Sequence, residues 1–329
     1  MNTTSLRPLG SSNIHVTPVA MGCWPIAGVT SLDVEEEQSL ATLQAAFDSG
    51  INFFDTAYCY GYSGESERLI GRALKDGKIG SRREIVIASK GGIHYGPDRK
   101  QARDGSPATL KRECRESLQR LGTDYLDLLY LHGPDPQVPL AESAGALREL
   151  MDEGLTRSVG VSNVTTAQLA VFAAACPLTA FQPHYNLLQR EIEASELPWC
   201  HTHNVAVCVY WPLMKGLLAG HLARDHQFDP RDGRAKYPMF RGEEFQRNID
   251  FVEQLRSIAG SRSVTELVIA WTISQPGITV ALCGAKRPHQ IHESAAGMAA
   301  SLSAEDRAAI DQAIAQRGTA ASEAAVKSS

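Results

Sequence analysis

Four side chains that can hold or transfer a proton stand at the ends of three apolar stretches of this sequence. They are Asp55 and Tyr60 after the run 51–54, Lys90 at the end of 84–90, and His132 at the end of 126–132. An ammonium next to a carboxylate forms an ion pair, and the same ammonium favours ionisation of a nearby phenol. If the four converge, Tyr60 could protonate a substrate oxygen to which His132 also forms a hydrogen bond.

Each of these residues, taken alone, also has a purely structural explanation. Asp55 could cap a turn and Tyr60 could pack a loop, while Lys90 could belong to an ion pair and His132 to the core. Four polar groups that end three strands of one sheet are harder to explain by packing. We therefore interpret Asp55, Tyr60, Lys90 and His132 together as a catalytic group, called here the tetrad.

The elements that would position the tetrad repeat along the chain. Short apolar segments typical of buried strands occur near residues 19, 52, 85, 127, 158, 180, 206 and 279, and helical patterns separate nearly all of them. Eight such units predict a closed (β/α)8 TIM barrel of parallel strands, in which the carboxyl ends of the strands converge on one face. An open doubly wound sheet is the alternative, but it would need more strands than usual, and its G-x-G-x-x-G motif is absent.

Local signals set the expected boundaries of the domain and its helices. Gly10-Ser-Ser-Asn13 lies between two short extended pieces and predicts an N-terminal β-hairpin. Residues 1–316 are expected to form a single barrel domain, with a long polar loop at 220–242 and a disordered tail at 317–329 rich in Ala and Ser. The predicted helix N-caps are Asp33, Ser106, Thr165 or Thr166, and Ser303.

Composition excludes several classes of function. The 329 residues are 43% hydrophobic and 21% charged with a net charge of −5, so there is no basic excess for nucleic acid or an anionic membrane. The seven cysteines include no C-x-x-C pair, which argues against a disulfide framework or a zinc cluster. We find neither an apolar signal core nor a membrane-spanning run, and therefore expect a cytoplasmic protein without a metal.

A series of motifs runs in order through most of the chain. They are Gly50-Ile-Asn-Phe-Phe-Asp-Thr-Ala-x-x-Tyr60 with Gly64-x-Ser66-Glu67, Ile87-Ala-Ser-Lys90, Asp127-Leu-Leu-Tyr-Leu-His132, Gly160-Val-Ser-Asn163, Gln182-x-x-Tyr185-Asn186, Tyr210-x-Pro212-Leu213 and Gly284-Ala285-x-x-Pro288-x-Gln290. On these motifs the chain resembles the aldo-keto reductase superfamily. The resemblance implies an NADPH-dependent oxidoreductase that reduces aldehydes or ketones, in which Tyr60 is the general acid, Lys90 and Asp55 tune it, and His132 orients the carbonyl.

Two other functions are the alternatives to this one. Some members of the superfamily bind NADPH mainly as regulatory subunits, so a redox-sensing module with little turnover is the alternative; the intact tetrad argues against it. A short-chain dehydrogenase would need a Tyr-x-x-x-Lys pair, and none of the nine tyrosines has a lysine four residues later.

The resemblance also implies where a cofactor would bind. Ser162, Asn163 and Gln182 would hold the nicotinamide carboxamide, which side-chain amides and hydroxyls can do through paired donors and acceptors, and Tyr210 would stack on the ring. Asp55 is counted among the cofactor contacts as well. The remaining implied contacts, at the pyrophosphate, 2′-phosphate and adenosine, are Trp211, Pro212, Leu213, Gly216, Gly284, Lys286, Arg287, Gln290, Glu293 and Ser294.

This sequence departs from the family pattern at two of these positions. The family commonly has Ser at Trp211 and Asn at Ser294. The substrate would be a small carbonyl or sugar-like molecule, with neither nucleic acid nor a membrane as partner. Trp24, Tyr58 and Cys59 are expected to shape its pocket, and the sequence leaves the oligomeric state open.

Overall fold

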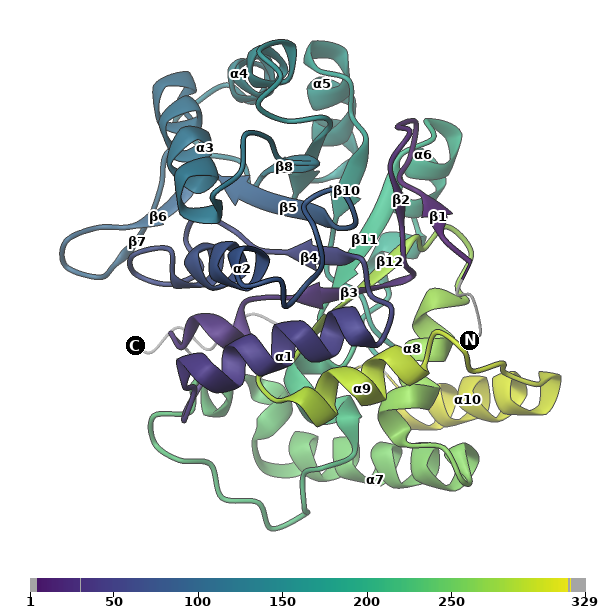
Figure 1. Ribbon diagram of the computed structural model, residues 1–329. Coiled ribbons are helices and arrows are strands. Elements are labelled where there is room, and N and C mark those ends of the chain that lie inside the picture. Colours follow the sequence, from purple (N-terminus) through teal and green to yellow (C-terminus); the bar gives the residue numbers. More distant parts are fainter. Residues whose placement is uncertain (1–4, 30, 319, 321–329) are drawn as a thin grey trace.

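The computed structural model describes residues 5–29, 31–318 and 320. Eight parallel strands close into a barrel in the spatial order β10-β11-β12-β3-β4-β5-β8-β9 (Figure 1). They are β3 (Val19–Gly22), β4 (Phe53–Asp55), β5 (Val86–Gly91), β8 (Leu128–Leu131), β9 (Val159–Ser162), β10 (Ala180–Gln182), β11 (Ala206–Tyr210) and β12 (Val280–Gly284). The predicted TIM barrel is confirmed, and each of the eight predicted strand positions lies in or next to one of these strands.

Helices surround the barrel and pack side by side around it (Figure 1). Helix α1 contacts α2 and α9, for example, and α3 contacts α2 and α4. The helices are α1 (Glu36–Asp48), α2 (Glu65–Lys75), α3 (Pro107–Leu121), α4 (Leu140–Asp152), α5 (Thr166–Ala175), α6 (Glu196–Thr202), α7 (Gly242–Ala259), α8 (Val264–Ile273), α9 (Pro288–Ala296) and α10 (Ala304–Arg317).

The strands are apolar throughout because both of their faces are buried. Adjacent residues of β4 show this: Phe53 belongs to the cluster inside the barrel and Phe54 to the cluster between strands and helices. Both rings are fully excluded from solvent. A strand with two buried faces reads as a continuous hydrophobic run, so a polar residue at its end marks the point where the chain leaves the core.

The predicted N-terminal hairpin is also confirmed. Strand β1 (Arg7–Pro8) pairs antiparallel with β2 (His15–Val16), and Val16 packs into the cluster inside the barrel. Gly10 has a φ of 54°, and a Cβ there would stand 2.2 Å from the carbonyl oxygen of Thr179. Only glycine fits this turn, because both the backbone conformation and the space exclude a side chain.

Three of the four predicted helix caps are correct. The side chains of Ser106, Thr165 and Ser303 accept hydrogen bonds from backbone N–H groups in the first turns of α3, α5 and α10. The prediction for Asp33 is wrong. Helix α1 begins at Glu36 after Glu35, which makes no side-chain cap, and Asp33 lies before it with a φ of 55°.

Two polar regions contain more structure than expected. An antiparallel hairpin, β6 (Ile93–Tyr95) and β7 (Gln101–Arg103), follows β5. The loop 220–242 includes the short 3₁₀ helices η4 (Gly233–Lys236) and η5 (Pro238–Phe240), and Phe240 is buried.

The predicted tail falls mostly beyond what the structure shows. Its residues 319 and 321–329 lie outside the described residues, and the first residue of the predicted tail, Arg317, belongs to α10. The Arg317 guanidinium donates hydrogen bonds to Asn248 of α7. Helix α10 is therefore joined to α7 up to its last residue.

Candidate active site

The structure brings three of the four tetrad side chains into direct contact around Lys90. Its ammonium nitrogen lies 2.5 Å from Asp55 Oδ1, 2.7 Å from the carbonyl oxygen of Thr56 and 3.3 Å from the Tyr60 hydroxyl. Asp55 is the last residue of β4, and Lys90 is the next-to-last residue of the neighbouring strand β5. The ends of two adjacent parallel strands thus place a carboxylate and an ammonium together, as expected at the carboxyl face of a barrel.

The Asp55–Lys90 pair is almost completely buried. The side chain of Lys90 is 0% exposed and that of Asp55 is 3% exposed. The second oxygen of Asp55 accepts a hydrogen bond of 2.8 Å from Gln182 Nε2. Burial raises the pKa of Asp55, and its contacts with Lys90 and Gln182 oppose that rise. The pair therefore depends on its hydrogen bonds to hold two charges away from water.

Tyr60 is half-buried between two other rings of the site. Its ring makes edge contacts with Trp24 at 5.0 Å and with His132 at 5.9 Å between centroids. Burial and then the Asp55 charge raise the pKa of Tyr60 well above its usual range. Lys90, 3.3 Å away, acts in the opposite direction and favours the phenolate, but burial and the Asp55 carboxylate, which both favour the neutral phenol, outweigh it. Tyr60 therefore keeps its proton at neutral pH.

His132 follows β8 directly and completes the group. Burial first, and then the charges of Lys90 and Arg103, lower the pKa of His132 well below its usual value, so its imidazole is neutral at pH 7. Its Nδ1 lies 3.5 Å from the Cys59 sulfur. Asn163 Nδ2 donates to the His132 carbonyl oxygen at 3.0 Å and so fixes the backbone at the end of β8.

The three predicted substrate-pocket residues do not all face the tetrad. Trp24 contacts the ring of Tyr60, and the thiol of Cys59 contacts His132. The Tyr58 hydroxyl instead donates to Glu116 of α3 at 2.6 Å, and its ring lies under the guanidinium of Arg120 at 4.2 Å. The side chain of Tyr58 is therefore engaged by helix α3.

Glu67, an acidic residue buried near the tetrad, has a role that the sequence analysis did not predict. Glu67 of α2 is fully buried, and it accepts hydrogen bonds from Ser89 at 2.6 Å and from Arg120 at 3.1 Å. Ser89 precedes Lys90, and Arg120 also donates to the carbonyl oxygen of Tyr58 at 3.3 Å. Glu67 thus connects the two segments that carry Lys90 and Tyr60. An acidic residue on the buried face of an amphipathic helix was the available signal.

Residues implied for the nicotinamide lie on the next three strands of the barrel. Ser162 ends β9, Gln182 ends β10 and Tyr210 ends β11. Asn163 has a φ of 58°, and its Oδ1 accepts a hydrogen bond of 2.8 Å from the Tyr210 hydroxyl. Because Gln182 also bonds to Asp55, this polar set is continuous with the tetrad.

The backbone after β11 is left-handed at several positions. Trp211, Met214, Lys215 and Gly216 have φ values of 57°, 46°, 55° and 88°. Successive N–H groups near such left-handed residues can form a concavity that suits a phosphate. The guanidinium of Arg234 lies 3.7 Å from the point where a Cβ of Gly216 would stand. In the segment 211–216, Pro212 has no N–H, and the N–H groups of Met214 and Gly216 donate to the carbonyl oxygens of Trp211 and Leu213 at 2.8 Å. The N–H groups of Leu213 and Lys215 could donate to an anion.

Cations are present near the start of α9. Lys286 and Arg287 come directly before its first residue, and their backbone N–H groups donate to Gln290 Oε1 at 3.0 and 3.2 Å. The Lys286 ammonium reaches the carbonyl oxygen of Leu32 at 3.2 Å. Gly284, at the end of β12, is exposed. This end of the site could accept a phosphate.

The two remaining adenosine-end residues are engaged within the protein. Glu293 lies 3.2 Å from His221 Nε2. Ser294 is buried, and its hydroxyl donates to the carbonyl oxygen of Gln290 at 3.1 Å. The Ser294 side chain is therefore directed back onto its own helix.

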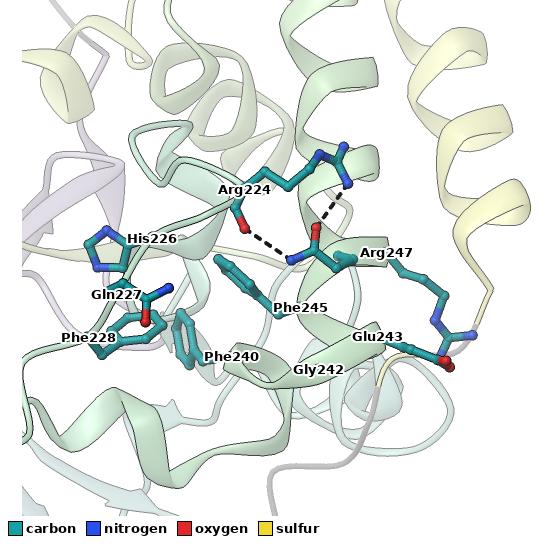
Figure 2. Close-up of a pocket in the computed structure, with 10 residues that line it drawn as sticks. Arg224, His226, Gln227, Phe228, Phe240, Gly242, Glu243, Phe245 and Arg247 are labelled. Atoms are coloured by element: carbon teal, nitrogen blue, oxygen red, sulfur yellow. Dashed lines mark hydrogen bonds between the residues drawn. The ribbon is translucent and has the colours of Figure 1, made fainter.

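A separate pocket of about 760 Å³ lies between the loop 220–242 and α7 (Figure 2). Its lining includes Phe228, Phe240 and Phe245, with Arg224 and Arg247 at its edge. None of the tetrad or the implied cofactor residues lines it. Within residues 5–29, 31–318 and 320 there is no cluster of three or more potential metal ligands, and no helix is long and apolar enough to cross a membrane.

Comparisons with known proteins agree with this geometry. Residues 18–315 match the model of the Aldo/keto reductase family. Aldo-keto reductase YhdN of Bacillus subtilis is 36% identical over 93% of this chain and 92% of its own length. The NADH-specific methylglyoxal reductase of Escherichia coli is 33% identical over 91% of this chain and 95% of its own length. The structure of the glycerol dehydrogenase AKR11B4 from Gluconobacter oxydans matches 98% of this chain and 99% of its own, with a TM-score of 0.88 and 32% identity.

Proposed function

This chain belongs to the aldo/keto reductase family, and from that premise we propose that it reduces aldehydes or ketones to alcohols with NADPH, using Tyr60 as the general acid. The family makes it an oxidoreductase that acts on carbonyl compounds with a nicotinamide cofactor. The observation that carries the finer proposal is the buried Asp55–Lys90 pair with the Tyr60 hydroxyl 3.3 Å from the Lys90 ammonium.

Tyr60 would supply the proton that the carbonyl oxygen takes up. A general acid must be protonated before it acts, and the raised pKa of Tyr60 meets that condition at neutral pH. As the proton leaves, negative charge develops on the phenol oxygen. The Lys90 ammonium is already at hydrogen-bond distance from that oxygen and would stabilise the charge, while Asp55 holds Lys90 in place.

His132 would orient the substrate. A neutral imidazole can donate one N–H to the carbonyl oxygen and polarise it without competing as a stronger acid. The edge contact between the His132 and Tyr60 rings supports a shared oxygen as their target.

The residues present fit a nicotinamide cofactor. When bound, that cofactor supplies the hydride. Ser162, Asn163 and Gln182 would hold its carboxamide. Ser162 ends β9, Asn163 follows it, and Gln182 ends the adjacent strand β10 and bonds to Asp55 of the tetrad. Tyr210 would cover one face of the ring. The left-handed backbone at residues 214–216 would hold the pyrophosphate.

The preference for NADPH rests on Lys286 and Arg287. Two cations before a helix N-terminus favour a phosphate dianion over a hydroxyl. A relative that is 33% identical is an NADH-specific methylglyoxal reductase, so membership of the family does not decide this point.

The experiment that tests the proposal follows the oxidation of NADPH, and in parallel of NADH, by absorbance with a panel of aldehydes and ketones. We expect turnover with several aldehydes and a lower KM for NADPH than for NADH. Binding of NADPH without turnover of any carbonyl would instead favour a regulatory, cofactor-sensing protein.

A further inference from the structure

One face of the hairpin β6–β7 packs against the segment that carries Tyr60. In its antiparallel register Ile93 pairs with Arg103. Residues directly opposite one another in such a pair have their side chains on the same face. Ile93 is buried against Ala57 and Cys59, in the segment that leads to Tyr60. Arg103 therefore faces the side of the hairpin that covers the active site.

The contacts of Arg103 place its guanidinium beside the end of β8. Its Nη1 donates to the carbonyl oxygen of Pro134 at 3.2 Å. The point where a Cβ of Gly133 would stand is 3.4 Å from that nitrogen and 3.9 Å from the Cβ of Asn163. The charge of Arg103 also contributes to the lowered pKa of His132. The guanidinium thus lies near His132 and near the proposed nicotinamide site.

The carboxylates of Asp104 and Asp135 accept hydrogen bonds from groups other than Arg103. Asp104 accepts hydrogen bonds from the Ser106 N–H at 3.0 Å and the Thr109 hydroxyl at 2.5 Å. Asp135 accepts from the N–H groups of Gly105 and Gln137 at 3.0 and 2.8 Å. Within the part of the chain that the structure describes, the hydrogen bond to Pro134 is the one that Arg103 makes through its side chain, and it uses one of five donors.

Aromatic rings pack next to Tyr60 on the face of the hairpin that Arg103 shares. Tyr95 lies two residues from Ile93 on the same face of β6, and it packs with Tyr60 against the cluster of Ala57, Cys59 and Ile93. Trp24 contacts Tyr60 from another side. The site therefore combines apolar side chains with a guanidinium that has no carboxylate partner among the described residues.

We propose that the substrate of this site is a carbonyl compound that also carries a carboxylate, and that Arg103 binds the carboxylate while the carbonyl lies at Tyr60 and His132. The inference rests on the proposed carbonyl reduction and names its substrate class. The planar guanidinium matches a carboxylate in shape and can bind it through two parallel hydrogen bonds. A single guanidinium balances one negative charge, which favours a carboxylate over a phosphate dianion.

The test compares pairs of aldehydes that differ in the charge of one carboxyl group, which is either free or a methyl ester. The pairs are 3- and 4-carboxybenzaldehyde and their methyl esters, assayed with NADPH on the wild type, Arg103→Met and Arg99→Met. Arg99 lies in the same hairpin but stacks on Tyr62, at 4.8 Å from the ring centroid, and serves as the control. The wild type should prefer an acid to its ester. Arg103→Met should raise KM for that acid at least tenfold, with kcat nearly unchanged, and leave the ester and the Arg99→Met kinetics as in the wild type.

Each other outcome has a defined meaning. Equal kcat/KM for acids and esters in the wild type would overturn the carboxylate proposal and leave carbonyl reduction intact. A lower kcat/KM for the acid and the ester alike in Arg103→Met would overturn the proposal and show that Arg103 contributes to folding or to cofactor binding. If no aldehyde is reduced, the proposed function fails, and calorimetric titration with benzoate decides the rest: binding that Arg103→Met abolishes supports the anion site, and its absence overturns it.

Discussion

The Lys90 ammonium lies 2.5 Å from Asp55 Oδ1, and neither side chain has meaningful access to solvent. Each charge is tolerated in the barrel because the other is present, since an isolated buried ion is costly. The same ammonium is 3.3 Å from the Tyr60 hydroxyl. The pair therefore links stability to chemistry, and variants can separate the two.

Lys90→Met keeps much of the apolar volume but removes the countercharge of Asp55. Activity should collapse, and the free energy of unfolding should fall by about 3–5 kcal/mol, the scale for a broken buried pair, unless Asp55 takes up a proton. The double variant Asp55→Asn/Lys90→Met should recover much of that stability without recovering activity. Denaturant unfolding and single-turnover kinetics on the single and double variants would measure both effects. Wild-type rates in Lys90→Met would make Lys90 a structural residue.

Tyr60→Phe removes the proposed proton donor and little else. Turnover should fall by about 10²–10⁴, while the Kd for NADPH, measured by fluorescence titration, should stay near the wild-type value. The raised pKa of Tyr60 also predicts a pH profile. A donor fails once pH exceeds its pKa, so the rate of the wild type should not decline before pH passes the ordinary tyrosine value of 10.0. A decline that begins near neutral pH and is absent from the residual activity of Tyr60→Phe would contradict this assignment.

His132 should make the fold sensitive to acid. Its pKa is lowered in the folded chain, so below the ordinary value of 6.5 the unfolded chain binds a proton that the folded chain does not. The contribution to stability is present above that value and is lost as pH falls. His132→Gln should therefore show a shallower loss of stability between neutral pH and pH ~5 in thermal unfolding. The exposed His289→Gln is the control for removal of a histidine, and identical slopes in His132→Gln and the wild type would refute the prediction.

The parts predictable from sequence were those that depend on the barrel itself. Parallel strands with two buried faces give continuous apolar runs, so their ends, and hence Asp55, Lys90 and His132, could be located from residue types alone. The hairpin β6–β7 was missed because its strand Gln101–Arg103 is polar and exposed and has no hydrophobic alternation. Arg103 was missed for the same reason.

Side-chain direction and electrostatics were not predictable in the same way. Tyr58 and Ser294 were expected near ligands, yet the Tyr58 hydroxyl bonds to Glu116 of α3 and the Ser294 hydroxyl bonds to Gln290 of its own helix α9. The pKa of Tyr60 depends on how far burial outweighs one nearby ammonium, which no spacing encodes. Asp33 has the residue type of a cap, but its left-handed backbone lies before the helix.

Glu67 should be important for stability because it is a buried charge with two donors. Glu67→Gln removes the charge that balances Arg120, and unfolding free energy should fall by about 1–3 kcal/mol. Glu116→Gln is the matched control, since Glu116 lies 3.5 Å from the same arginine but its side chain is 37% exposed. The free energy of unfolding of Glu116→Gln should fall by less than about 1 kcal/mol, the usual limit for surface ion pairs. If chemical denaturation finds the same loss of unfolding free energy in both variants, burial does not make the Glu67–Arg120 contact more stabilising than the Glu116–Arg120 contact.

The cofactor preference can be tested at the start of α9. Replacing Lys286 and Arg287 together with Ala should weaken NADPH binding by about 1–3 kcal/mol more than NADH binding, because charge-assisted hydrogen bonds to a phosphate would be lost only for NADPH. Lys286 already reaches the Leu32 carbonyl oxygen, so thermal unfolding of the free protein must be measured alongside to detect loosening of that contact. His289→Ala, an exposed change in the first turn of the same helix, is the control. Equal weakening of NADPH and NADH binding in calorimetric titration, with thermal unfolding unchanged, would mean that these cations do not bind the 2′-phosphate. A preference for NADPH must in that case arise elsewhere.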